Sequence, residues 1–283
     1  GGGNGHHGHA VAPTIGDAMS PLWGHLGIVA AVISVVMMVL WEIQRRRGDA
    51  SLVDAGWSAG IGLGGVVLLV LGEGDLTRRV VTAALVGVWS FRLTSHLIYD
   101  RLIGKPEDGR YQMLRKKWGD SAALWFFVFF QFQAVLVVFF VLPFVVIAAT
   151  PAAFGAWYDW LGVMIWLASW LGESLADRQL AHWRRDSANH GRTCRAGLWR
   201  YSRHPNYFFE WTLWFSYVAL AMTSSWWPTT LIVPVVLLFL LLMVTGIPYT
   251  EKRALASRGD DYRAYQRSTS PFIPWFPRSE KVL

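Results

Sequence analysis

Long apolar stretches, separated by short polar segments, dominate the sequence. A run of about 20 apolar residues with few charges is long enough to cross a bilayer as a helix. The pattern therefore predicts an all-α integral membrane protein with seven transmembrane helices. We expect the fourth span to tilt or break near Pro143, because proline disturbs a helix interior. The predicted spans are residues 21–41, 52–71, 80–98, 122–149, 154–176, 207–223 and 228–248.

Basic residues collect on one side of these seven spans. Cytoplasmic loops of membrane proteins carry an excess of Lys and Arg, so the basic side is expected to face the cytosol. This places the N-terminus outside, in a bacterial inner membrane or an endoplasmic-reticulum-like membrane, and the C-terminal tail in the cytosol. The net charge of +7 follows from this topology and from attraction to phosphate, with no need for nucleic acid. Of the 26 Lys and Arg, 23 fall in the inner segments 45–47, 101–117, 178–203 and 252–281.

The spans divide the chain into three parts. We expect residues 1–20 to be a flexible tail, with His6, His7 and His9 as a weak, adventitious metal binder at most. Residues 21–150 are expected to form a four-helix membrane half around a substrate cavity. Residues 151–283 are expected to form a C-terminal domain with a cytosolic loop and tail. The single cysteine, Cys194, excludes a CxxC metal site, and we interpret it as passive.

Residues 191–211, GRTCRAGLWRYSRHPNYFFEW, carry the strongest candidate chemistry. Arginine presents a forked, always-charged donor that suits phosphate oxygens. Glu210 lies just inside an apolar span, where an ionisable residue is costly enough to indicate function. The segment therefore predicts a site for an anionic cofactor beside a lipid-dissolved substrate. The simpler alternative is that the arginines set orientation and Glu210 pairs at the helix end.

Two charged residues within the first spans also need an explanation. Arg92 lies in the third span, and an arginine in lipid requires a partner. Asp54, near the end of the second span, is the natural candidate. Asp54 is either a protonated donor or an ionised partner of Arg92, and the sequence leaves both open. Gly56, Gly60 and Gly64 follow at four-residue spacing and predict a close helix-packing face.

The tail EKRALASRGDDYRAYQRSTSPFIPW predicts one more helix. Charged residues and tyrosines recur with near-helical spacing through Gln266, and Pro271 ends the pattern. We expect this short amphipathic helix to fold back under the bundle. It would bring Glu251, Tyr262 and Tyr265 close to the RHPNY segment.

The segments GLWRYSRHPNYFFEW and GDDYRAYQRSTSPFIPW resemble the C-terminal domain of the steroid 5α-reductase family of integral membrane oxidoreductases. The likeness covers the chain from about Glu173 onward, and the first half is similar in span count and in WSFRLTSHL and DGRYQMLRKKWG. A related RHPxYxGE pattern occurs in isoprenylcysteine carboxyl methyltransferase-like proteins. The catalytic Gln-Glu pair of the reductases is absent as a dipeptide, and Asp54 lies nearest to it by context.

The resemblance implies an NADPH pocket that faces the cytosol. It assigns Asn206 and Glu210 to the nicotinamide end, Arg192 to the phosphates, and Asp177 and Arg184 to the adenosine side. It implies that the rest of the pocket is lined by Arg203, His204, Tyr207, Glu251, Tyr262 and Tyr265.

These residues lead to one leading hypothesis and two alternatives. The leading hypothesis is NADPH-dependent reduction of a carbon-carbon double bond in a steroid-like or other lipidic enone. Asp54, Arg92 and Glu210 are the candidate catalytic residues, the substrate is a lipidic small molecule within the membrane, and no metal is required. The first alternative is an S-adenosylmethionine-dependent methyltransferase with a membrane-embedded acceptor. The second is a catalytically inactive structural subunit of a membrane complex.

Overall fold

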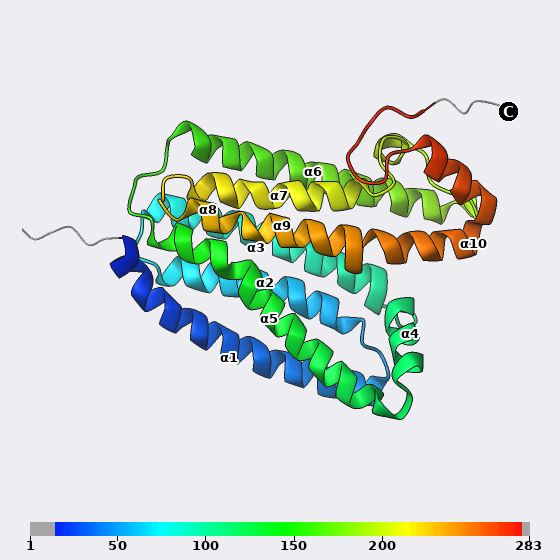
Figure 1. Ribbon diagram of the computed structural model, residues 1–283, viewed down its shortest axis with the longest axis horizontal. Coiled ribbons are helices and arrows are strands. Elements are labelled where there is room, and N and C mark those ends of the chain that lie inside the picture. The colour runs from blue at the N-terminus through cyan, green and yellow to red at the C-terminus, as the bar shows by residue number, and fades with distance from the viewer. Residues whose placement is uncertain (1–14, 279–283) are drawn as a thin grey trace, which may run out of the picture.

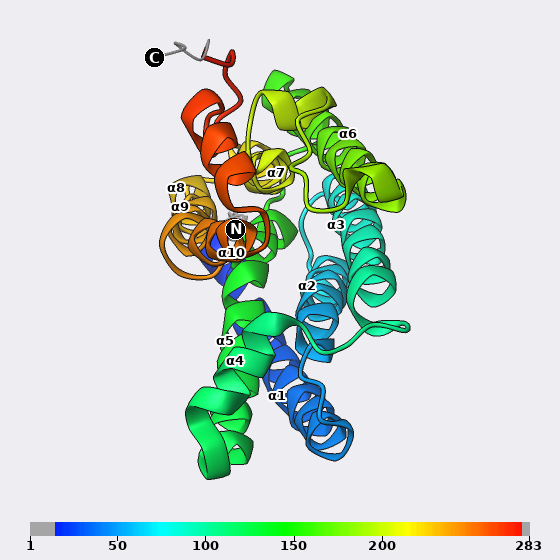
Figure 2. The ribbon, with the colours of Figure 1, turned by 90° about the vertical axis from the view of Figure 1, so that its right-hand side faces the viewer.

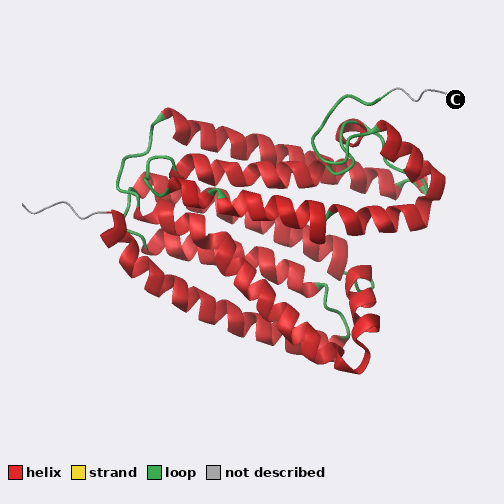
Figure 3. Cartoon of the chain, viewed as in Figure 1, coloured by secondary structure: helices red, strands yellow, loops and turns green. Residues whose placement is uncertain are grey.

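The computed structural model describes residues 15–278, which form a bundle of helices without a strand (Figures 1 and 3). The predicted tail histidines, His6, His7 and His9, lie outside the described residues. The helices are α1 (Ile15–Arg47), α2 (Leu52–Leu71), α3 (Leu76–Leu97), α4 (Gly109–Trp118), α5 (Ala122–Ala149), α6 (Trp157–Arg185), α7 (Pro205–Ala221), α8 (Trp227–Thr230), α9 (Ile232–Phe239) and α10 (Ile247–Ser268).

The prediction of an all-helical membrane protein is confirmed. Five stretches of the described chain are long and apolar enough to cross a membrane. The predicted spans 154–176 and 207–223 are also helical, as parts of α6 and α7, and run alongside the others in Figure 1. The five candidate stretches are Gly16–Arg47, Leu52–Leu71, Leu76–Leu102, Gly109–Ala149 and Trp227–Ser268.

Helix α5 lies at the centre of the bundle and packs against α1, α2 and α7, as the end-on view in Figure 2 shows. Its second half, from Val141 to Ala149, is almost wholly buried by neighbouring helices, whereas Leu124, Phe132 and Val135 in the first half are exposed apolar residues. Phe126, Phe130, Phe140 and Phe144 on α5 are all fully buried. The expected break at Pro143 does not occur, because α5 continues through it to Ala149.

The predicted packing face of α2 is confirmed. A Cβ atom added at Gly60 would lie 3.3 Å from Val137 on α5, and one at Gly64 would lie 3.1 Å from Val29 on α1. Glycine at these positions lets the helix backbones approach closely. This tight packing fixes the position of Asp54 at the start of α2.

The last apolar stretch is divided, and the tail then folds back. Helices α8 and α9 are followed by a π-helical turn at residues 240–244, and Gly246 separates this turn from α10. Gly259 has φ of 52°, a conformation that favours glycine, and it bends α10 midway. The predicted tail helix is confirmed, with its end at Ser268. Figure 1 shows α4, α10 and the last turns of α1 and α6 at one end of the bundle, which we call the basic end.

The opposite end of the bundle contains a fully buried ion pair between Arg78 and Asp159. Arg78 also donates to the carbonyl of Leu220 at 2.7 Å, and Asp159 accepts from the amides of Gly155 and Ala156. We name these two side chains the Arg78 pair. It ties the start of α3 to α6 and α7.

Candidate functional site

The RHPNY segment forms the start of α7 at the basic end of the bundle. Pro205 occupies the first turn of the helix, where its missing N–H is not needed. Because residues four apart share one helical face, Asn206 and Glu210 point in one direction and Tyr207 points in another. Asn206 and Glu210 therefore enter one group of residues, and Tyr207 enters another.

Three carboxyl groups and one guanidinium group meet beside Asn206, and we call them the acidic cluster. Its members are Arg92 on α3, Glu173 and Asp177 on α6, and Glu210 on α7. The guanidinium of Arg92 pairs with both Glu173 and Asp177. The Asn206 amide donates to Asp177 at 3.2 Å. Arg92 thus bridges α3 and α6 beside the start of α7.

Two tryptophans hold the carboxyl group of Glu210 from opposite sides. The indole N–H of Trp89 donates to Oε2 at 3.0 Å, and that of Trp214 donates to Oε1 at 3.2 Å. The two rings pack edge to face with centroids 5.6 Å apart. Both tryptophans are buried, so the orientation of Glu210 is fixed by packing as well as by hydrogen bonds.

The acidic cluster is short of positive charge, and its hydrogen bonding is incomplete on both sides, at Nη1 of Arg92 and at Oε2 of Glu173. Three carboxyl groups share the single guanidinium of Arg92, and His96 lies at the edge, 3.8 Å from Asp177. Oε2 of Glu173 is buried and accepts no hydrogen bond. The carboxyl groups of Glu173 and Glu210 are near enough to interact directly. A proton held by this pair would supply the donor that is otherwise lacking.

The expected pairing of Arg92 with Asp54 is wrong. Arg92 pairs with Glu173 and Asp177 on α6. Asp54 instead pairs with Arg101 and Arg110 and accepts a hydrogen bond from the Tyr111 hydroxyl at 2.7 Å. The second and third spans do pack against each other, but the guanidinium groups that reach Asp54 are those of Arg101, in the turn after α3, and Arg110, on α4. Two guanidinium groups and a hydroxyl donor therefore surround the carboxyl group of Asp54.

Tyr207 connects the start of α7 with this second group. Its ring stacks on the His204 ring with centroids 5.4 Å apart. The nearby guanidinium groups of Arg101 and Arg110 interact with it electrostatically. Tyr207 is therefore a contact between the α7 start and the residues around Asp54.

Arg203, His204 and Glu251 form a third group, which we call the Arg203 clamp. Arg203 donates to Glu251 at 2.7 Å and to the carbonyls of Gln266 and Thr269. The His204 ring lies 3.3 Å from the same Glu251 oxygen. Burial lowers the pKa of His204, and the Glu251 carboxylate only partly opposes this. The clamp ties α7 to α10, so Arg203 is engaged within the protein.

The expected return of the tail to the RHPNY segment is confirmed. Tyr265 donates its hydroxyl to the carbonyls of Trp199 and Ser202, and Tyr262 packs edge to face against it. Both tyrosines are buried. They hold the loop that precedes α7 in place.

The other residues predicted to bind the cofactor, Arg184, Arg192 and Asp177, do not lie together in the structure. Arg184, in the last turn of α6, and Arg192, on the loop after it, are both exposed, and neither guanidinium forms a hydrogen bond or ion pair within the described chain. Asp177, which was expected beside Arg184 on the adenosine side, lies instead in the acidic cluster next to Asn206. Cys194 is buried, and burial raises the pKa of its thiol, which agrees with a passive role.

Cavities near the RHPNY segment lie on its outer side, along the tail. Two adjoining pockets are lined by residues of the α10 end and the loop before α7, and neither is lined by Asp54, Arg92 or Glu210. Within residues 15–278, no three His, Cys, Asp or Glu side chains are arranged to hold a metal ion.

Sequence reasoning missed several residues of these groups. Glu173 is not among the residues predicted for the site, although it lies four residues before Asp177 and so shares one helix face with it. Its position one turn from Asp177 is the signal that could have placed it beside Arg92. Trp89 and Trp214 carry no signal of their own, because tryptophan is frequent throughout this sequence.

The fold and this site define a helical membrane protein with a buried charged cluster near one end of the bundle. The chain belongs to the family described as "Protein of unknown function (DUF1295)", whose profile matches residues 40–269. It is similar to an uncharacterized protein of Schizosaccharomyces pombe, with 27% identity over 228 residues, covering 70% of this chain and 65% of the yeast protein. No solved structure matches the chain.

Proposed function

We propose that this protein is an NADPH-dependent membrane reductase that saturates a carbon-carbon double bond of a steroid-like or other lipidic enone. The acidic cluster is the observation that carries the proposal. An ionisable group inside an apolar span is costly, and here three carboxyl groups and a guanidinium converge from three helices. Its incomplete hydrogen bonding suits a site that exchanges protons.

The proposal includes seven spans with the N-terminus outside. Helices α6 and α7 complete the set, and the arginine-rich segments lie together at the basic end, which the positive-inside rule assigns to the cytosol. Single cysteines at the exposed residues Glu73 and Ser187, in a chain with Cys194 replaced by Ser, test this orientation. A membrane-impermeant maleimide should label E73C in intact cells and should not label S187C.

The residues that would hold NADPH fall into two sets. Exposed Arg184 and Arg192 suit its phosphates, since neither is engaged with another side chain. Asn206 and Glu210 would meet the nicotinamide end. Arg203 does not fit the phosphate role, because its guanidinium is taken up by the clamp. When bound, NADPH supplies the hydride that reduction of the double bond requires.

The chain's own groups account for the proton. Reduction of an enone adds a hydride at the β-carbon and a proton at the α-carbon. The proton would come from the pair formed by Glu173 and Glu210, which takes the place of the missing Gln-Glu pair. Arg92 and the two indoles fix these carboxyl groups in position, and preorganised groups of this kind need no rearrangement during the reaction.

Titration of the purified full chain with NADPH and with S-adenosylmethionine tests this proposal. We expect NADPH to bind and to be weakened in R192A, because a charge-assisted contact to phosphate is lost. R47A is the matched control, since Arg47 is also exposed at the basic end. Binding of S-adenosylmethionine with no affinity for NADPH would overturn the reductase.

A methyltransferase is the second candidate, and one observation favours it. The acidic cluster has more carboxyl groups than cations, and a sulfonium cation would be attracted to such a site. S-adenosylmethionine carries no phosphate, however, and would leave Arg184 and Arg192 without a role. The same titration distinguishes the two.

A further inference from the structure

Residues 269–278, which we call the strap, follow α10 and run back past the start of α7. Four backbone or hydroxyl bonds hold the strap. Arg203 N–H donates to the Ser270 carbonyl at 2.8 Å, and the Ser202 hydroxyl donates to the Phe272 carbonyl at 2.7 Å. Trp275 N–H donates to the Tyr201 carbonyl, and Arg278 N–H to that of Ser268. The strap is therefore a preorganised surface.

Two adjoining pockets lie beside the strap and share Ser268 and Thr269 in their walls. Their volumes are about 210 Å³ and about 290 Å³. A water molecule takes about 30 Å³ in the liquid, so either pocket accepts a group the size of a phosphate ester. No Asp or Glu lines either pocket. The arginines that line them are Arg195, Arg200, Arg203, Arg267 and Arg278.

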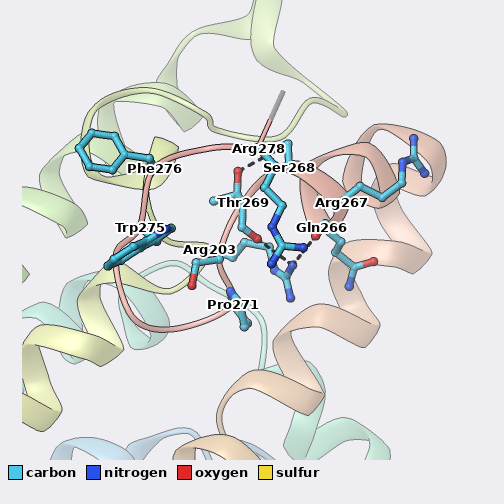
Figure 4. Close-up of a pocket in the computed structure, with 10 residues that line it drawn as sticks. Arg203, Gln266, Arg267, Ser268, Thr269, Pro271, Trp275, Phe276 and Arg278 are labelled. Atoms are coloured by element: carbon cyan, nitrogen blue, oxygen red, sulfur yellow. Dashed lines mark hydrogen bonds between the residues drawn. The ribbon is translucent and has the colours of Figure 1, made fainter. Parts of the chain in front are cut away.

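These arginines differ in how far they are already paired. Arg203 belongs to the clamp, and Arg195 pairs with Asp261 at 3.1 Å. Arg200 and Arg278 have no acidic partner within the described chain. Figure 4 shows the side chain of Arg278 directed into the pocket towards Arg203, whereas Arg267 points away from it. The guanidinium groups of Arg278 and Arg203 both line the smaller pocket, and this concentration of positive charge calls for an anion beside them.

The edge of the strap is apolar. Ile273, Trp275 and Phe276 are 58%, 69% and 78% exposed, whereas Phe272 of the same segment is buried. Aromatic side chains at this level are typical of the interface between headgroups and acyl chains. A site for a phosphate dissolved in water would not need such an apolar edge.

We propose that the strap pocket binds the headgroup of an anionic phospholipid. Arg278 contacts the phosphate oxygens, Arg200 lines the adjoining pocket and adds positive charge beside the headgroup, the hydroxyls of Ser268 and Thr269 line the walls, and the exposed rings of the strap lie among the acyl chain ends. This site is separate from the proposed cofactor site, and it does not depend on NADPH binding. Its lipid would brace the clamp that holds the start of α7.

Native mass spectrometry of the detergent-solubilised full chain tests this proposal, with phosphatidylglycerol or phosphatidylcholine as the added probe. We expect a retained adduct with phosphatidylglycerol and little with phosphatidylcholine. R278A should weaken the adduct about fivefold, the amount that one basic residue near an anionic surface contributes. R278K should keep part of the affinity, because lysine retains the charge and loses the fork.

Two variants separate the pocket from general positive charge. R267A should have a smaller effect than R278A, since its side chain points away from the pocket. R47A should have no effect, although Arg47 is exposed at the same end of the bundle. Equal losses in R47A and R278A would contradict a defined pocket.

Two competitors separate the sources of phosphate. If inorganic phosphate at the lipid's concentration displaces phosphatidylglycerol, the site is one for a free anion and the lipid assignment is wrong. If NADPH displaces the lipid, the pocket belongs to the cofactor, which also contradicts the proposal. Retention of the lipid against both probes supports it, whether or not NADPH binds elsewhere.

Discussion

Two arginines inside the bundle, Arg78 and Arg92, illustrate the difference between a structural and a functional charge. Arg78 is fully buried with one carboxylate, Asp159, and both partners use further backbone groups of neighbouring loops. Arg92 pairs with two carboxyl groups, Glu173 and Asp177, beside a third, Glu210, and Glu173 keeps a buried oxygen without a donor. The Arg78 pair is balanced, so we assign it to stability. The acidic cluster is unbalanced, so we assign it to chemistry.

Breaking the Arg78 pair should have the largest effect on stability. Removing one partner of a buried ion pair leaves an uncompensated charge and costs about 3–5 kcal/mol. We expect R78A to lower the unfolding free energy by this amount, measured by thermal unfolding in detergent. The double variant R78M/D159L should be no less stable than R78A. If the double variant loses the sum of both single changes, the two residues are not coupled.

Glu210→Gln should have the next largest effect. Each carboxyl oxygen of Glu210 accepts a hydrogen bond from an indole N–H. In glutamine an NH₂ group replaces one of these oxygens, so one indole N–H would face another donor and lose its hydrogen bond. An unsatisfied buried donor costs about 1–3 kcal/mol. Thermal unfolding of E210Q should show a loss in this range. An unchanged melting temperature would mean that the two tryptophans do not bond this carboxyl group.

Acid should weaken the Arg203 clamp. The pKa of His204 is lower in the folded protein than in the unfolded chain, because burial disfavours its charged form. The unfolded chain therefore binds the proton more readily, and stability falls as pH drops below about 6.5. Unfolding measured between pH 8 and pH 5 should show this loss, and H204N should reduce it. A pH dependence identical in H204N would exclude His204 as its source.

Glu173→Gln should have the smallest effect on stability and a large effect on activity. The change removes one of three crowded carboxyl groups and adds a donor beside Glu210, so we expect equal or greater stability. Asp177→Asn is the matched control one turn away. Both of its oxygens are engaged, by Arg92 and by Asn206, so D177N should be destabilising. If E173Q and D177N lose the same free energy of unfolding, Oε2 of Glu173 is not the unbonded oxygen of the cluster.

The helices were predictable from sequence because an apolar run of about 20 residues in a bilayer can satisfy its backbone hydrogen bonds only as a helix. The fold-back of the tail also followed from its pattern, with Tyr265 and Glu251 arriving as expected at the start of α7. Partners across helices were harder to predict. The pattern places Arg92 on a helix face, and it does not state whether α2 or α6 lies opposite that face.

Burial of loop-proximal charges was not predictable either. Arg78 lies between two apolar runs of the sequence, where a charged residue is usually exposed, yet it is fully buried. Arg203 was assigned to a cofactor, and its guanidinium is instead taken up by carbonyls of the α10 end. In both cases the guanidinium group is bound by a carboxylate from another helix and by backbone carbonyls, whose positions depend on tertiary packing and leave no pattern in the sequence.

The most direct test of the central claim is to follow the label from NADPH deuterated at its reactive carbon during incubation with a steroid-like enone. We predict that the full chain transfers the deuterium to the β-carbon of the saturated product. E173Q, folded at least as stably as the wild type, should form this product much more slowly. Retention of the label in the cofactor, with methyl transfer from S-adenosylmethionine to a lipid instead, would contradict the proposed reductase.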